Sequence, residues 1–89
     1  MIEKDITIVN KLGLHARAAA KLVSLASKFS CEVHVAKEGR QVNGKSIMGV
    51  MMLAASKNST ITLITDGEDE RQALEEMESL ILDRFGEEE

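Results

Sequence analysis

His15 occupies the position in this sequence that suggests the most chemistry. It stands directly before an alanine-rich segment, residues 16–28, whose composition and apolar spacing predict a helix. The first backbone N–H groups of a helix lack internal partners and, together with the helix dipole, attract anions. A phosphate carried on His15 could rest against the amides of Ala16 and Arg17, and the Arg17 guanidinium suits phosphate oxygens. The segment therefore combines a nucleophile with groups that stabilise its phosphorylated form, although the same pattern also fits an exposed histidine without a role.

The short apolar run at residues 47–53 is a second segment with functional potential. Ser46 precedes it and is a preferred residue type for a helix N-cap. A helix this short cannot bury every side, and an exposed apolar patch is typical of a protein interface. We expect a partner interface formed by this helix, with Met48 and Met51 most exposed, and by the outward face of the first helix. The candidate interface residues are Lys21, Ser24, Ile47, Met48 and Met51.

Patterns elsewhere in the chain predict the elements that must position these residues. Alternating or β-branched segments predict strands at residues 5–9, 32–37, 40–43 and 60–65. Glu38-Gly39 predicts a two-residue hairpin turn. Helical spacing predicts helices at residues 16–28, at residues 47–53 and from about Asp69, with Gly86 ending the last one. The element order β-α-β-β-α-β-α predicts an α+β fold with one layer of helices on one sheet.

Size and charge limit what the chain can do. Its 89 residues predict one domain, which we take to span residues 1–86, followed by an acidic C-terminal tail at residues 87–89. The net charge is −4, yet residues 6–31 and 39–65 contain no acidic side chain. These two positive regions would attract an anion or an acidic partner, unless the acids elsewhere merely solubilise a C-terminal helix. Aromatic residues make up only 2% of the chain, which together with the acidic balance argues against nucleic-acid binding.

The remaining composition predicts a cytoplasmic protein without a bound metal or cofactor. Cys31 is the single cysteine, so the chain cannot form an internal disulfide and fits a reducing compartment. No apolar run approaches the roughly 18 residues needed to cross a bilayer, so we expect no membrane insertion. The first residues show no signal-peptide pattern. No histidine or aspartate stands at the spacing of metal ligands.

Two segments of the chain resemble the HPr-type phosphocarriers of the bacterial phosphoenolpyruvate-dependent phosphotransferase system. Residues 10–17 (NKLGLHAR) resemble the active-site segment of that family, and residues 44–51 (GKSIMGVM) resemble its second signature. The resemblance extends over nearly the whole chain. It implies an HPr-like open-faced β-sandwich, in which three helices cover one face of a four-stranded antiparallel sheet. The strand order that it implies, numbered along the chain, is 1-4-2-3.

The resemblance also implies roles for the candidate residues. His15 would receive a phosphoryl group on Nδ1 from phosphorylated enzyme I and pass it to an enzyme IIA domain, with Arg17 stabilising the phosphate. The chain would then be a monomeric phosphocarrier with a phosphohistidine intermediate rather than a turnover enzyme. An HPr kinase/phosphorylase would phosphorylate Ser46, which a helix N-cap tolerates and which would weaken the docking of an acidic partner.

Ala18 stands where members of this family usually carry proline. Alanine can adopt the same helical conformation but leaves the entry to the helix less rigid. This departure leaves open whether the chain belongs to the sugar-transport branch or to its nitrogen-related paralogue. The alternative function is a regulatory binding module that responds to phosphorylation and has no role in sugar transport. Neither the downstream acceptor nor the sugar follows from the sequence.

Overall fold

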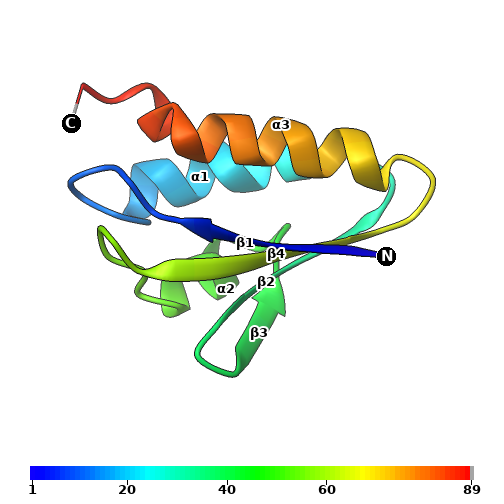
Figure 1. Ribbon diagram of the computed structural model, residues 1–89, viewed down its shortest axis with the longest axis horizontal. Coiled ribbons are helices and arrows are strands. Elements are labelled where there is room, and N and C mark those ends of the chain that lie inside the picture. The colour runs from blue at the N-terminus through cyan, green and yellow to red at the C-terminus, as the bar shows by residue number, and fades with distance from the viewer. Residues whose placement is uncertain (89) are drawn as a thin grey trace.

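Four antiparallel strands form the sheet in the computed structural model, which describes residues 1–88 (Figure 1). The strands are β1 (Ile2–Thr7), β2 (Glu32–Lys37), β3 (Arg40–Asn43) and β4 (Thr60–Asp66). They lie in the order β1-β4-β2-β3, and every neighbouring pair is antiparallel. The α+β class and the predicted element order are confirmed, and so is the strand order implied by the family resemblance.

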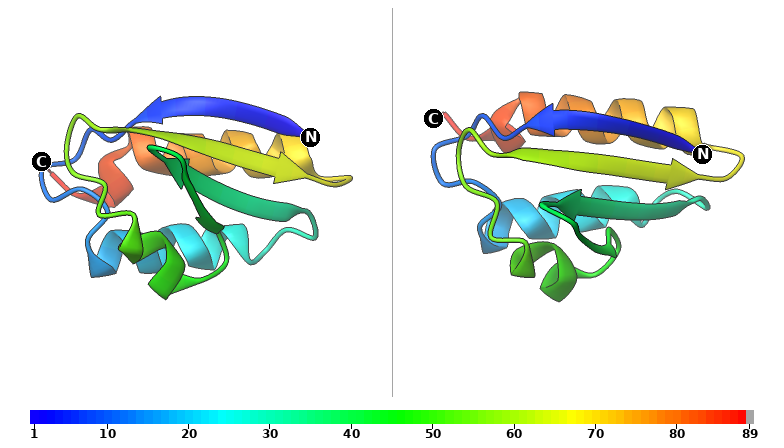
Figure 2. Two further views of the ribbon diagram at one scale, coloured as in Figure 1. Left: turned by 90° about the horizontal axis from the view of Figure 1, so that it is seen from below. Right: turned by 60° about the horizontal axis from the view of Figure 1, so that its bottom comes forward.

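Three helices cover one face of the sheet. The helices α1 (Ala16–Ala26) and α3 (Glu70–Leu82) run antiparallel to each other along the sheet (Figure 1). The short helix α2 (Ile47–Met52) lies beside α1 (Figure 2). A 3₁₀ turn, η1 (Arg84–Gly86), follows α3. Because α1 and α3 are antiparallel, the segment after α3 returns to the end of the molecule at which α1 begins, as all views show.

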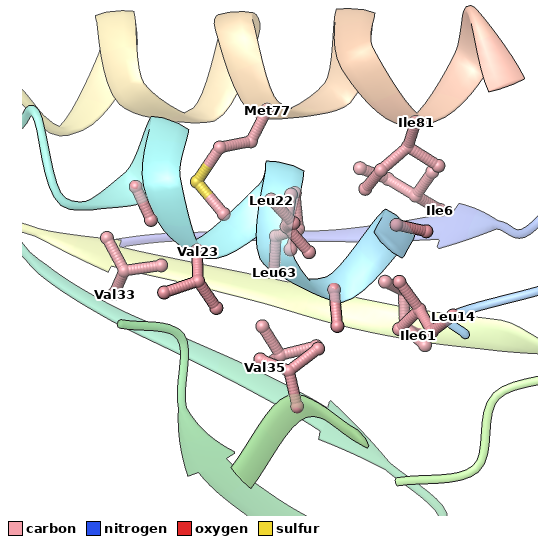
Figure 3. Close-up of a cluster of buried hydrophobic side chains, with 14 of the residues drawn as sticks. Ile6, Leu14, Leu22, Val23, Val33, Val35, Ile61, Leu63, Met77 and Ile81 are labelled. Carbon is pink, nitrogen blue, oxygen red and sulfur yellow. The ribbon is translucent and has the colours of Figure 1, made fainter. Parts of the chain in front are cut away.

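The core lies between the sheet and the two long helices (Figure 3). Alternate residues of the strands point towards the helices and are buried, as the pleat of a sheet requires. These strand residues include Ile6, Val33, Val35, Ile61 and Leu63. The helices add Leu22, Val23, Met77 and Ile81. Burial of each large apolar side chain contributes about 1.5–3 kcal/mol, so this layer holds the helices in place on the sheet.

Element boundaries differ from the predicted ones where hydrogen bonding rather than hydrophobicity decides them. Alternation predicts a first strand at residues 5–9, but β1 is Ile2–Thr7, because these are the residues that pair with β4. The helix predicted to reach about residue 28 ends at Ala26, where the chain tightens into a turn. The hairpin turn is as predicted: Glu38 (φ 49°) and Gly39 (φ 84°) are both in the left-handed region that a type I′ turn requires.

Asp69 ties the start of α3 to the turn between α1 and β2. Its carboxylate accepts hydrogen bonds from the backbone N–H groups of Ser30 (2.8 Å) and Cys31 (2.9 Å). These bonds, above all the one from Ser30, favour the ionised form and lower the pKa of Asp69 below its ordinary value of 3.8. A carboxyl group whose pKa is lowered by folding stabilises the folded state above its ordinary pKa. That stabilisation is lost as the pH falls through the pKa of the folded state.

We predict that Asp69→Ala lowers the midpoint of urea unfolding at neutral pH, because two backbone donors lose their charged acceptor. The difference from the unmodified chain should narrow as the pH falls below 3.8, because the Asp69 carboxylate then takes up a proton first in the unfolded state and, at lower pH, in the folded state. Circular dichroism at a series of pH values measures both effects. Glu75→Ala, at an exposed position of α3, is the matched control and should leave the midpoint unchanged. A difference that stays constant in acid would contradict this account.

Candidate functional site

His15 is the N-cap residue of α1, the position that the sequence predicts. Its backbone is extended (φ −72°, ψ 177°), and its carbonyl accepts a hydrogen bond from the Ala19 N–H at 2.8 Å. The amides of Ala16 and Arg17 find no acceptor among residues 1–88. The imidazole is half-buried, with 26% of the side chain exposed. A ring that solvent can reach thus lies beside open main-chain donors at the positive end of a helix dipole.

The loop that precedes His15 is held against the segment between α2 and β4. The N–H of Leu14 donates to the carbonyl of Ala55 at 2.8 Å, and the Leu14 side chain is buried. Gly13 has a φ of +65°, and a Cβ at this position would lie 2.4 Å from the Ala55 oxygen. Glycine alone tolerates both the dihedral angle and the close approach. The contact therefore fixes where α1 begins.

The side chain of His15 contacts a residue from the far end of the chain. Its Nε2 lies 2.5 Å from Oε2 of Glu87. The other carboxylate oxygen of Glu87 accepts a hydrogen bond from Nδ2 of Asn10 at 3.0 Å. Asn10 is fully buried, and its Nδ2 also donates to the carbonyl of Gly13 at 2.9 Å. A chain of hydrogen bonds thus connects the loop before α1, the segment after α3 and the imidazole.

The orientation of the Asn10 amide follows from its partners. The Gly13 carbonyl and the Glu87 carboxylate can only accept hydrogen bonds, so the amide nitrogen must face both of them. The Asn10 oxygen is then buried without a partner among residues 1–88, which costs about 1–3 kcal/mol. The two bonds donated by Nδ2, one of them to a charged group, offset this cost.

Glu87 is an ionised acceptor in this arrangement. The hydrogen bond from Asn10 is the largest influence that lowers the pKa of Glu87 below its usual range; desolvation opposes it and the contact with His15 adds to it. An ionised carboxylate has no hydrogen to donate. The hydrogen in the contact therefore belongs to Nε2 of His15, which donates it to Glu87.

Phe85 anchors the segment that carries Glu87. Its side chain is buried in the core, although both Arg84 (φ 57°) and Phe85 (φ 55°) are in the left-handed region. Each such residue costs about 1–2 kcal/mol, and burial of a phenylalanine side chain contributes a similar amount. Nζ of Lys21 on α1 donates to the Phe85 carbonyl at 2.6 Å. These contacts bring the chain back to the start of α1.

A hollow of about 340 Å³ adjoins the contact between His15 and Glu87. Its lining comprises Lys11, Leu12, Arg17, Glu87 and Glu88, so cations and carboxylates share it. Arg17 is exposed and forms no ion pair within residues 1–88. Its guanidinium is therefore available to an anion that approaches the N-terminus of α1.

Ser46 is the N-cap of α2, as predicted, and its Oγ accepts a hydrogen bond from the Gly49 N–H at 3.1 Å. The three apolar interface candidates on α2 are exposed: Ile47 by 44%, Met48 by 71% and Met51 by 38%. Met52, which the sequence analysis did not single out, is 59% exposed. Because α2 lies beside α1 (Figure 2), this patch adjoins the helix that begins at His15.

Lys21 and Ser24, the interface candidates on α1, are exposed and line a shallow groove between α1 and α3 together with Arg17 and Lys28. Three of the basic residues of the first acid-free region therefore gather along α1 and the turn that follows it, whereas Lys11 lies in the loop before α1. Lys45, from the second region, instead donates to a carbonyl in the turn after α1 at 2.7 Å. The two positive regions of the sequence thus meet only in part.

The sequence analysis assigned no role to Asn10, Glu87 or the exposed Leu12. Asn10 and Glu87 are 77 positions apart, and a hydrogen bond over such a distance leaves no periodic signal in a sequence. Glu87 also belongs to a run of acids whose pattern indicates a solvated segment. The one available signal for Asn10 was a polar residue between a predicted strand and Gly13.

Metal ligands, membrane-spanning helices and the cysteine were further candidate features of the sequence. Residues 1–88 contain no group of three or more His, Cys, Asp or Glu side chains placed to hold a metal ion. None of the described helices has the length and apolar character to traverse a bilayer. Cys31 is buried and free.

Gly13→Ala should destabilise the fold by about 3 kcal/mol, because the new methyl group adds a clash to an unfavourable backbone angle. Gly39→Ala is the matched control: Gly39 also has positive φ (+84°), but nothing lies within 4 Å of its added Cβ. That variant should lose only about 1 kcal/mol. Urea unfolding measures both, and equal losses would show that the approach to Ala55 carries no cost of its own.

Comparisons with known proteins identify the family to which the chain is similar. A family profile described as the PTS HPr component phosphorylation site matches residues 2–83. The phosphocarrier protein HPr of Cupriavidus necator is 59% identical over 87 residues, which cover 98% of each chain. A crystal structure of HPr-C-His from Thermoanaerobacter tengcongensis superimposes with a TM-score of 0.96 at 47% identity and covers all of both chains.

A crystal structure of an HPr dimer from the same organism is also similar, with a TM-score of 0.79 and 47% identity over 98% of this chain and all of that one. The family profile and the curated relatives both extend over nearly the whole chain. The chain therefore belongs to the HPr family, the phosphocarrier proteins of the phosphotransferase system.

Proposed function

We propose that His15 is the residue that carries the phosphoryl group, accepting it from phosphorylated enzyme I and passing it to an enzyme IIA domain. The observation that carries this proposal is the position of the His15 imidazole. The ring is partly exposed at the N-cap of α1, beside amides that have no partner among residues 1–88. Phosphoryl transfer depends mainly on the positioning of the group and the neutralisation of its charge, and the N-terminus of α1 together with Arg17 can supply both.

In the proposed reaction, Nδ1 of His15 attacks the phosphorus of the donor while the donor's own bond to phosphorus breaks. The amides of Ala16 and Arg17 and the Arg17 guanidinium then hold the transferred group. A nucleophile that belongs to the next protein then attacks the phosphorus, and the bond between phosphorus and Nδ1 of His15 breaks. The chain returns unchanged, so it acts as a carrier rather than as an enzyme that turns over a small molecule.

The exposed apolar side chains of α2 are the proposed docking surface for these partners. Ile47, Met48 and Met51 offer flexible apolar contacts, and Met52 enlarges the same surface. We include Lys21 and Ser24 of α1 in the proposed interface, because both are exposed along the groove between α1 and α3 and the charge of Lys21 favours an acidic partner. His15, Arg17 and this surface all belong to one copy of the chain, so we propose that a monomer performs the relay in the cytoplasm.

Ser46 is the proposed site of regulatory phosphorylation by an HPr kinase/phosphorylase. Its hydroxyl caps α2 next to Ile47, at the edge of the docking surface. A phosphoserine would add about two negative charges there, and these would repel an acidic partner. The modification would therefore act on docking and leave the imidazole itself intact.

His15→Ala should abolish phosphate acceptance while the fold persists, because His15 is partly exposed and its side chain lies outside the core. Incubation with radiolabelled phosphoenolpyruvate and enzyme I measures acceptance, and circular dichroism confirms folding. His34→Ala, on β2, is the control and should label normally. Full labelling of His15→Ala would refute the site. Labelling of the unmodified chain without onward transfer to an enzyme IIA domain would favour a regulatory binding module.

Ser46→Asp should slow phosphoryl transfer from enzyme I by raising KM, since the added charge opposes docking, and should leave His15 reactive at high donor concentration. Steady-state labelling over a range of enzyme I concentrations separates KM from kcat. Ser79→Asp places the same charge on the exposed face of α3 and should have little effect. An unchanged KM for Ser46→Asp would count against the regulatory role.

A further inference from the structure

We infer that Glu87, held by Asn10, is a positioning residue for His15: its carboxylate keeps the imidazole hydrogen on Nε2 and so leaves the lone pair of Nδ1 for the phosphoryl group. The inference rests on the proposed function of His15. It adds a residue that lies outside both signature segments and outside residues 2–83, which the family profile matches.

The first step is the chemistry of the contact. A neutral imidazole has one nitrogen that donates and one that accepts, and either nitrogen can take either role. The carboxylate of Glu87 accepts only, and it lies 2.5 Å from Nε2. In the neutral ring, Nε2 is therefore the donor and Nδ1 the acceptor. No protein group within residues 1–88 occupies Nδ1, so its lone pair is open to an electrophile.

The second step is the support behind Glu87. Asn10 is fully buried and directs its Nδ2 at the carboxylate, while its own oxygen remains without a partner in the described chain. The unpaired oxygen shows that the two bonds donated by the amide nitrogen, to Gly13 and to Glu87, set the orientation of this side chain. Phe85 and Lys21 fix the backbone just before Glu87. The carboxylate is thus held from both sides.

The third step is the balance of the transfer. The Nδ1 lone pair forms the new N–P bond, and the electron pair of the broken bond stays with the partner that donated the phosphoryl group. The ring then carries a positive charge, with its hydrogen still on Nε2 and shared with the Glu87 carboxylate. When the next nucleophile attacks phosphorus, the N–P electron pair returns to Nδ1. No proton enters or leaves, and Glu87 neutralises the charged ring in between.

Glu88 provides a matched comparison within the same chain. It is the neighbouring residue, carries the same charge and lines the same hollow, but within residues 1–88 it forms no hydrogen bond or ion pair with His15. A general effect of negative charge on an incoming phosphate would follow from changing either residue. An effect on the orientation of the imidazole would follow from changing Glu87 alone.

The test compares Glu87→Gln with Glu88→Gln in the full chain. Long-range ¹H–¹⁵N correlation spectra of the unphosphorylated protein identify which ring nitrogen carries the hydrogen and whether that hydrogen is strongly bonded. We expect a downfield Nε2 hydrogen in the unmodified chain and in Glu88→Gln, and its loss in Glu87→Gln. With enzyme I as donor, kcat for Glu87→Gln should fall about 10- to 100-fold with little change in KM.

Three results would overturn the inference: an Nδ1 hydrogen in the unmodified chain, an unchanged kcat for Glu87→Gln, or an equal loss for Glu88→Gln. Circular dichroism of each variant shows that it is folded. Failure of the proposed function itself looks different, because the unmodified chain would then not be labelled on His15 at all. The spectra report the contact in the unphosphorylated chain and are independent of that outcome.

Discussion

The approach of Gly13 to the carbonyl of Ala55 is the constraint on which the rest of the site depends. It sets the point at which the loop turns into α1, and the adjacent hydrogen bond from Leu14 locks the same two segments together. If the loop sat further away, α1 would begin elsewhere and the amides of its first turn would not adjoin His15. A contact between two backbone segments thus determines the chemistry of a side chain.

The antiparallel arrangement of α1 and α3 supplies the second half of the site. The chain leaves α1 at one end of the molecule and returns along α3, so that residues 72 positions apart meet. Phe85 ends this return by entering the core, and the left-handed backbone there turns the chain towards His15. Burial of an aromatic side chain and placement of a carboxylate are therefore consequences of the same turn.

Much of this arrangement follows from local sequence rules. The strands β2 and β3, the hairpin turn between them and the caps at His15 and Ser46 are all set by residues close in sequence, and they occur where predicted. The start of β1 was missed because pairing with β4 extends it into a polar stretch without alternation. The tertiary hydrogen bonds of Asn10 and Glu87 could not be predicted, because nothing in the sequence around either residue indicates the other as its partner.

The exposure of the site suits a carrier better than a deep pocket would. An exposed helix N-terminus stabilises an anion by about 0.3–1 kcal/mol, and a hydrogen bond to a charged group contributes about 1.5–3 kcal/mol. In the proposed relay, two amides and one guanidinium would therefore hold a phosphoryl group firmly enough to pass it between proteins, yet weakly enough to release it. The proposed reaction also requires each partner to reach Nδ1 from outside. The partly exposed ring of His15, with Nε2 bonded to Glu87, leaves Nδ1 accessible for this purpose.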